Sequence, residues 1–406
     1  MRESRAALPD NIRAVIDALR FNGRGLERLC AVREEEWPAL LDWCDQRQLT
    51  LLLHSVCAAD LPESVRERMN ASRDRCARRF SNLLSDLDEI ASALERRDIP
   101  FVVLKGITHS PTFTPDPLLR AQGDIDLWFP ASEIENAQSV LLGLGYQPRR
   151  AAHGDGRHLP PMARPNDWRW RGDVFDPEMP IHVEAHFTLW SDGAEYIVAP
   201  GQTDFWNRRV TRDFDERPLP VLSPPDLLGF AALHFLLHLL HGDLPLQRAW
   251  EIASFLHSNV DNDVFWNRWR QLHHPALRRL EALVFAITQV WFRCDVHAVA
   301  QQHIDTLARD VKLWLRHFVF SPLRRYGAPN KDELWLHLAL VSSASGRLRV
   351  LLRRLFPPVL ARKGGLSTSR LAHHWRTFTP TLMTGLRWLW LKHQEHRSEP
   401  LPASLP

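Results

Sequence analysis

The sequence lacks the cysteine spacings of metal-binding or disulfide-rich domains. Its 406 residues contain five cysteines, with no C-x-x-C pair and no Cys/His ligand spacing. We therefore expect reduced thiols that behave as small buried hydrophobic side chains, four of them in a helical N-terminal segment. The cysteines are Cys30, Cys44, Cys57, Cys76 and Cys294.

Long apolar runs are absent as well. The longest, from Leu227 to Leu240, contains His234 and His238 and is too short to span a bilayer. The N-terminal stretch lacks the apolar core of a signal peptide. The composition, 45% hydrophobic and 24% charged, is that of an ordinary globular protein. We expect a cytoplasmic protein without a transmembrane segment.

Acidic residues are scarce near the C-terminus. Residues 344–406 hold eleven Lys or Arg against two Glu, so this tail carries about +9 and the remainder about −6. An amphipathic helix packed on the body explains the tail, and such a region can help to form a substrate cleft. An anionic partner, either a membrane surface or a nucleic acid, is the alternative.

The pattern along the chain predicts helices, then a small α/β core, then more helices. Apolar residues spaced by three and four predict a helix from about Ser81 to a break before Pro100. From Ser223 onward the chain reads as helical. The expected units are a helical region at 1–97, an α/β core at 98–215, a helical domain lining the cleft at 216–345, and a basic helical tail at 346–406.

Three strands are predicted in the core. They are Phe101–Leu104, Asp124–Phe129 and Ile181–Trp190, the last with clean alternation at its start. Ser132 and Glu135 form a capping signature for a helix that ends near Gly145. Residues 150–180 are rich in Pro, Gly, Asp and Arg, which predicts a long loop.

Two aspartates interrupt the second apolar strand. Because residues i and i+2 of a strand point to the same side, Asp124 and Asp126 should project together. On the third strand, Glu184 shares its face with His182 and His186. Carboxylates on rigid neighbouring elements suit a divalent cation such as Mg²⁺, with Glu184 as the third ligand.

Paired cations held by carboxylates are a recurring device for phosphoryl and nucleotidyl transfer. Lys105 offers a positive charge for phosphate, and Gly106 permits a close backbone approach. Arg120 adds a second cationic contact. Each residue also has a plain structural explanation. D-x-D alone occurs in solvated loops, Lys105 would extend to solvent at a strand end, and Arg120 would pair with a nearby aspartate.

The order of these motifs resembles the DNA polymerase β-like nucleotidyltransferase superfamily, and within it an uncharacterised bacterial family. That family's V-x-L-K-G, Arg and D-[IL]-D-L elements match Val102–Gly106, Arg120 and Asp124–Leu127. Its [DE]-x-H-[WF] strand matches Glu184–Phe187, and its L-S-x-x-D-L-L helix matches Leu222–Leu228. The likeness spans roughly residues 20–260.

The resemblance implies an α+β fold, in which a small mixed β-sheet nucleotidyltransferase core is flanked by N-terminal and C-terminal helical regions. It implies that Asp124, Asp126 and Glu184 hold Mg²⁺ or Mn²⁺, and that Lys105 and Gly106 take the place of the superfamily's nucleotide-binding turn. Two departures affect the nucleotide contacts: Lys105 replaces a small residue, and the spacing from Gly106 to Asp124 is long. An acidic residue after a later Trp is matched by Trp250-Glu251.

The resulting hypothesis is a metal-dependent nucleotidyltransferase. It would move a nucleoside monophosphate from ATP or another NTP to a hydroxyl or phosphate of an acceptor, which is a peptide, polysaccharide, protein or RNA. Glu184 is also the best-placed candidate base. The alternatives are a catalytically silent scaffold or polyanion-binding protein that retains the fold, and a kinase-like phosphotransferase.

Histidines complete the set of candidates. His186 shares the face of Glu184, and His238 lies on the later apolar helix, so both are candidates for lining the site. His234, His238 and His241 share one helical face, which also suits Zn²⁺. No Cys or carboxylate at a fixed spacing completes a zinc site, so a helix face packed against the catalytic strands is the preferred interpretation.

Overall fold

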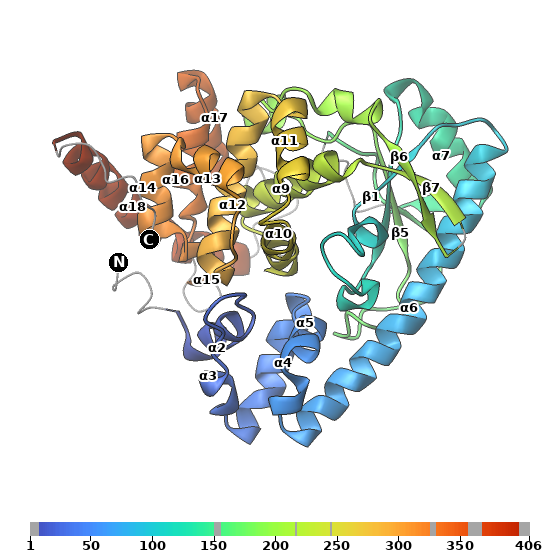
Figure 1. The fold of residues 1–406 in the computed structure, drawn as a ribbon, viewed down its shortest axis with the longest axis horizontal. Helices are drawn as coiled ribbons and strands as arrows, with labels where there is room; N and C mark the ends of the chain where they lie inside the picture. The colour runs from blue at the N-terminus through green and yellow to red at the C-terminus, as the bar shows by residue number, and fades with distance from the viewer. Residues whose placement is uncertain are drawn as a thin grey trace.

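The computed structural model describes residues 8–149, 156–215, 217–243, 246–324, 330–355 and 368–397. It has an α+β fold, as expected, with one mixed sheet of seven strands between helical regions (Figure 1). No helix within the described ranges is long and apolar enough to cross a membrane. The strands are β1 (Val102–Leu104), β2 (Asp124–Trp128), β3 (Gln147–Pro148), β4 (Met162–Ala163), β5 (His182–His186), β6 (Val210–Phe214) and β7 (Arg217–Val221).

Helices precede the sheet, as the apolar spacing predicts. The longest, α6, buries a stripe that includes Leu83, Leu87, Ile90 and Leu94, and it ends before Pro100. The four N-terminal cysteines lie in these helices, and all five cysteines are free thiols. The helices of this half are α2 (Asp10–Ala18), α3 (Glu27–Cys30), α4 (Trp37–Gln46), α5 (Thr50–Cys57), α6 (Glu63–Glu95), α7 (Ile134–Gly143) and α8 (Asp192–Glu195).

The described residues after Ser223 are predominantly helical, which was also expected. Pro275 stands at the first position of a helix there, where its missing N–H costs nothing. These helices are α9 (Pro224–His241), α10 (Leu246–Ser258), α11 (Asp263–Leu272), α12 (Pro275–Phe292), α13 (Ala298–Asp305), α14 (Arg309–Phe318), α15 (Ser321–Arg324), α16 (Glu333–Leu340), α17 (Ala344–Leu355) and α18 (Thr368–Arg397).

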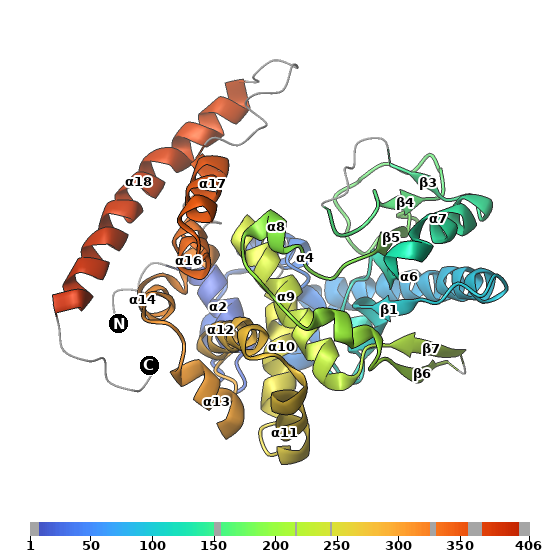
Figure 2. The ribbon, with the colours of Figure 1, turned by 90° about the horizontal axis from the view of Figure 1, so that it is seen from above.

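The sheet has the order β3-β4-β5-β2-β1-β7-β6. In its centre β2 pairs antiparallel to β1 and parallel to β5. One face packs on α6 and α7 through Val103, Ile125, Leu127 and Val183. The opposite face turns toward α9 and α10, which lie on the other side of the sheet from α6 (Figures 1 and 2). The alternation within β2 thus separates a buried apolar face from a polar one.

The described residues form two large apolar cores and one small cluster around Cys76 and Phe175. One large core joins the sheet to α6 and α7, and the second joins α2–α5 to α9 and the helices that follow it. The sequence contains 16 tryptophans. Four of them are completely buried in the second core, where they pack as large apolar side chains: Trp266, Trp269, Trp291 and Trp314. The division of the chain into the four expected units stays a prediction.

Four local predictions were wrong. Helix α6 begins at Glu63, well before the expected start near Ser81. Strand β5 ends at His186 rather than Trp190, because the N–H groups of Phe187 and Thr188 turn away to the carbonyl of Arg157. The capping signature at Ser132 is not used: a short 3₁₀ turn precedes α7, and its N-cap residue makes no side-chain capping bond. The long loop predicted at 150–180 contains the short strand β4 among its described residues.

Candidate functional site

Strands β2 and β5 bring the predicted carboxylates together. Asp126 stands opposite Glu184 in the parallel register, and Asp124 stands opposite His182. Adjacent residues in register on neighbouring strands point to the same face of a sheet. Asp124, Asp126 and Glu184 therefore share the polar face, while Ile125 and Val183 pack into the core beneath α6.

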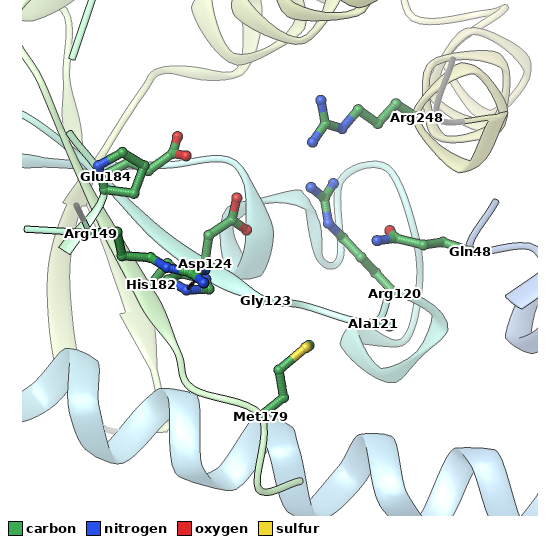
Figure 3. Close-up of a pocket in the computed structure, with 11 residues that line it drawn as sticks. Gln48, Arg120, Ala121, Gly123, Asp124, Arg149, Met179, His182, Glu184 and Arg248 are labelled. Atoms are coloured by element: carbon green, nitrogen blue, oxygen red, sulfur yellow. Dashed lines mark hydrogen bonds between the residues drawn. The ribbon is translucent and has the colours of Figure 1, made fainter. Parts of the chain in front are cut away.

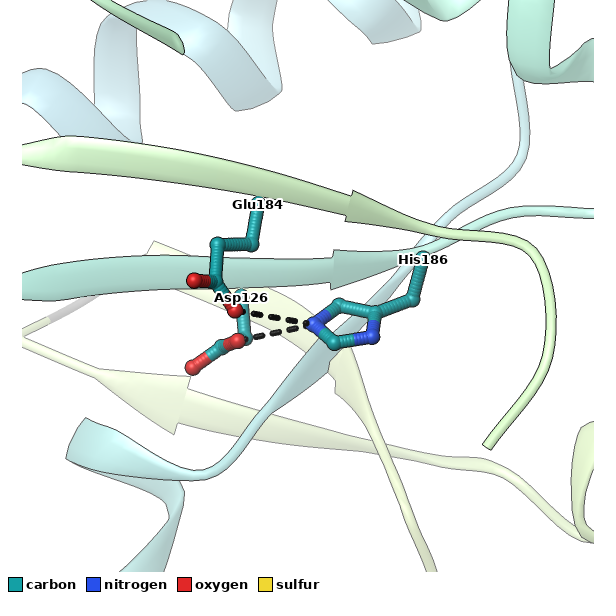
Figure 4. A group of neighbouring side chains, drawn as sticks. All are labelled: Asp126, Glu184 and His186. Atoms are coloured by element: carbon teal, nitrogen blue, oxygen red, sulfur yellow. Dashed lines mark hydrogen bonds and ion pairs between the residues drawn. The ribbon is translucent and has the colours of Figure 1, made fainter. Parts of the chain in front are cut away.

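A compact group of potential metal ligands forms at this point. One ligand atom each from Asp126, Glu184 and His186 lies within 4.8 Å of the others (Figure 4). His186 Nε2 is 2.8 Å from Asp126 Oδ1 and 3.5 Å from Glu184 Oε2. Two carboxylates and an imidazole fit a divalent cation, with the carboxylates suited to Mg²⁺ or Mn²⁺. Sequence reasoning placed His186 near the site without making it a candidate ligand.

Lys105 already balances the charge of this group. Its Nζ lies 2.7 Å from Asp126 Oδ1 and 3.9 Å from Glu184 Oε2, and the side chain is almost completely buried. Burial by itself would raise the pKa of Glu184, but the hydrogen bond with His186 and the charge of Lys105 lower it to about 2. Such a carboxylate is ionised near neutral pH, as a cation ligand must be, and its role as the base stays a prediction.

The same contacts hold His186 in place. Burial disfavours its charged form, yet its hydrogen bonds to Asp126 and Glu184 prevail and raise its pKa. The ring also lies against His158, with the ring centroids 5.0 Å apart. His186 therefore helps to fix the orientation of the Asp126 and Glu184 carboxylates.

A cavity of about 440 Å³ opens beside the carboxylates. Asp124 and Glu184 point into it from the sheet, and the guanidinium groups of Arg120 and Arg248 point into it from the opposite side (Figure 3). Arg149 lines it as well, with Nη1 2.8 Å from His182 Nε2. Carboxylates facing guanidinium groups across a cavity can bind a cation and a polyanion next to each other.

Arg120 is buried and held by an ion pair. Its Nη1 lies 3.0 Å from Glu251 Oε2, and His109 Nδ1 lies 2.9 Å from the same oxygen. Burial opposes the charge of Glu251, but Arg120 and His109 prevail and lower its pKa to about 2. Glu251, the acidic residue of the Trp250-Glu251 pair, thus positions Arg120 at the cavity wall.

Arg248 was missed by sequence reasoning. It lies one helical turn before Glu251 on α10, and its Nη1 is 2.9 Å from His234 Nδ1. Within the described part of the chain it has no carboxylate partner at ion-pair distance. Burial and the charge of Arg120 lower the pKa of Arg248. A half-buried guanidinium that faces a cavity and has no carboxylate partner among the described residues is the arrangement expected of an anion site.

The Lys105-Gly106 turn is strained. Lys105 has φ 49° and ψ −157°, a region that non-glycine residues rarely adopt, and Gly106 has φ 50°. A side chain at Gly106 would also meet Gln122, whose Oε1 would be 2.7 Å from the new Cβ. Neither Lys105 nor Gly106 is among the residues that line the cavity. Their expected contact with phosphate stays a prediction.

The three helical histidines do not converge on one point. His238 Nε2 lies 3.2 Å from His234 Nε2, and its Nδ1 lies 3.1 Å from Asp243. His241 instead lies 2.9 Å from Glu195. Among the described residues, the group of potential metal ligands is the one at Asp126, so the zinc alternative gains no support. His238 does not line the cavity.

A second cavity, of about 370 Å³, adjoins the first and shares Arg149 and His182 with it. Trp168 and Trp170 line this second cavity, with ring centroids 6.1 Å apart. Trp170 is 57% exposed, and Trp168 Nε1 donates to Asp176. Room for a planar or apolar group therefore lies next to the charged cavity.

Of three comparisons with known proteins, the one with family models gives a match. The searches of curated proteins and of solved structures return none. A family model described as "Uncharacterised nucleotidyltransferase" matches residues 33–293, which is more than half of the chain and includes every residue of the carboxylate group and the cavity arginines. The chain therefore belongs to this uncharacterised nucleotidyltransferase family.

Proposed function

We propose that this protein is a metal-dependent nucleotidyltransferase that moves a nucleoside monophosphate from an NTP to a hydroxyl or phosphate of an acceptor. One observation carries the proposal. Asp124 and Glu184 face Arg120 and Arg248 across a single cavity, with Asp126 directly beside Glu184. A metal–triphosphate complex has both the cationic and the anionic surface that this arrangement matches.

In the proposed mechanism, Asp124, Asp126 and Glu184 hold Mg²⁺ or Mn²⁺. The bound cation would supply charge neutralisation for the triphosphate and polarise the attacking oxygen. Arg120 and Arg248 bind the phosphate oxygens on the opposite wall. Lys105 and His186 contact Asp126 and Glu184 and hold both carboxylates in orientation.

The reaction itself is an in-line displacement. The acceptor oxygen forms a bond to the α-phosphorus, the bond from that phosphorus to the bridging oxygen breaks, and pyrophosphate leaves. The acceptor proton passes to solvent or to the leaving pyrophosphate. The chain contributes positioning and charge, since this chemistry requires no covalent enzyme intermediate.

The proposal is tested by NTP binding and by transfer of label. The purified protein binds an NTP in the presence of Mg²⁺ or Mn²⁺, and an α-³²P-labelled NTP labels an acceptor in a lysate or the protein itself. D124N, D126N and E184Q each lower transfer by at least about 100-fold, because each removes charge from the cation site. D213N is the matched control, since Asp213 is exposed on β6 of the same sheet.

The outcomes separate the alternatives. Label transferred from the γ-phosphate and not from the α-phosphate supports the kinase-like reaction and contradicts this proposal. An absence of metal-dependent NTP binding supports the silent scaffold. Carboxylate variants that bind and transfer like the wild type also overturn the proposal, provided that their thermal unfolding matches that of D213N.

A further inference from the structure

An apolar stripe covers the outer face of α18. Five large hydrophobic side chains there are each 56–63% exposed. They recur at the spacing of one helical face, so they form a continuous surface rather than scattered residues. We call them the apolar face of α18: Leu382, Met383, Leu386, Leu389 and Trp390.

The opposite side of the same helix is firmly packed. Trp388 and Leu391 are buried, and the Trp388 ring lies 6.0 Å from that of Phe318 in α14. Gly385 fits against the Trp335 ring of α16. This contact fixes the helix on the body, so the apolar face is held outward.

Negative charge is missing from this outer surface. Residues 378–395 contain a single acidic residue, Glu395, which is buried and bound by Arg309 and Arg316. Arg387 is exposed along the edge of the apolar face. The neighbouring α17 has no Asp or Glu, and it exposes Leu348 and Leu352. The surface is therefore apolar with a basic edge.

We propose that the apolar face of α18 binds the surface of an anionic lipid bilayer. A helix with exposed Leu, Met and Trp on one face, basic neighbours and no exposed acid lies in the interface plane, with its apolar side chains among the acyl chains and its basic groups at the phosphates. In Figure 2, α18 and α17 stand at the edge of the molecule, where a flat surface can approach them.

Charge and composition favour lipid over other occupants. Residues 344–406 carry about +9 by the sequence count, which complements an anionic surface. A nucleic-acid site would present basic and aromatic groups, whereas four of the five residues of this face are Leu or Met. The inference is independent of the proposed function, because the face shares no residue with the cavity.

Vesicle flotation with the full chain tests this inference. We expect the protein to float with vesicles of phosphatidylcholine and phosphatidylglycerol, to bind pure phosphatidylcholine more weakly, and to lose binding as salt rises. The double variant L386E/L389E lowers binding by at least about tenfold, because it places charge within the apolar face of α18, which would enter the bilayer. L142E is the control, since Leu142 is also an exposed leucine, on α7.

Three results would overturn the inference. The first is equal binding to neutral and anionic vesicles. The second is L386E/L389E floating as well as L142E while both unfold at the wild-type temperature. The third is the absence of vesicle binding together with a dimer in light scattering, or with RNA binding, that the double variant abolishes. That third result would assign the face to a second copy or to RNA.

Discussion

Arg120 and Arg248 reach the same cavity with their charges balanced in different ways. Arg120 pairs with Glu251, whereas Arg248 finds the neutral partner His234 at hydrogen-bond distance and no carboxylate among the described residues. Burial also lowers the pKa of His234 well below its usual value, and the charge of Arg248 adds to this effect. Of the two guanidinium groups, Arg248 therefore has more to gain from an incoming phosphate.

The variant R248M tests this difference. Loss of one charge-assisted contact should weaken NTP binding by roughly 10- to 100-fold. The fold should keep its stability or gain slightly, because the charge that is removed is half-buried and has no ion-pair partner among the described residues. Isothermal titration with NTP and Mg²⁺ measures the first effect, and urea unfolding measures the second. R209M, which alters an exposed arginine that stacks on Trp206, should change neither. Equal affinity of R248M and R209M would contradict the role of Arg248.

The residue scale also shows where sequence reasoning ends. Strand alternation was enough to predict that Asp124, Asp126 and Glu184 share a face, because the period of two fixes side-chain direction. The pairing of Lys105 with Asp126 was not predictable, because it depends on the strained turn after β1. Arg248 lies far along the chain, and only the packing of α10 brings it to the cavity.

At the scale of elements, α6 supports the site through one buried side chain. Arg79 donates from Nε to the carbonyl of Gln122, and from Nη1 to the carbonyls of Asp176 and Met179. These carbonyls belong to the segments that lead into β2 and β5. Arg79 therefore holds in place the two segments that precede the carboxylate-bearing strands β2 and β5.

We expect R79M to destabilise the protein by about 2–4 kcal/mol, because it leaves three carbonyls without their donor in a buried region. NTP affinity should fall as well, since the strands lose a shared anchor. Urea unfolding and titration measure the two effects. R73M, on the same helix, removes only a partly exposed ion pair with Asp116 and should cost less than about 1 kcal/mol. Equal costs for R79M and R73M would show that the anchor is unimportant.

Elements with strong periodicity were predictable, and short or proline-containing ones were not. The apolar spacing in α6 and the apolar runs of β1 and β2 were enough to predict these three elements at the centre of the fold. Strand β7 contains Pro218 and Pro220, which normally argue against a strand, so the β6–β7 hairpin at the sheet edge was missed. Strands β3 and β4 have two residues each, too few for any period to be visible.

On the scale of the whole molecule, helices distant in sequence share one core. Residues of α2–α5 pack with those of α9–α16, whereas the C-terminal half of α6 packs with the sheet. The cavity lies where these two units meet: Gln48 and Arg248 come from the first, and Asp124 and Glu184 from the second. Sequence periodicity predicts single elements and not the contacts between them. It therefore could not predict that the N-terminal helices pack against the C-terminal helices.

A buried histidine links several helices of the large core and makes stability depend on pH. His273 Nε2 lies 3.2 Å from Asp226 on α9, and its Nδ1 lies 2.9 Å from Glu281 on α12. Burial opposes the charged ring, but Glu281 and Asp226 prevail and raise its pKa to about 9. The folded state therefore holds a proton that the unfolded chain releases at a lower pH.

This linkage predicts a loss of stability on the alkaline side. The contribution of His273 is complete below the unfolded pKa of about 6.5 and disappears as pH rises through about 9, a change of roughly 3 kcal/mol in the free energy of unfolding. Urea unfolding between these pH values measures the slope. In H273Q the slope should flatten, with the largest loss relative to wild type at low pH, where the charged ring contributes most. H54Q, on the surface beside Asn70, should keep the wild-type slope. A wild-type slope in H273Q would assign the alkaline loss to other groups.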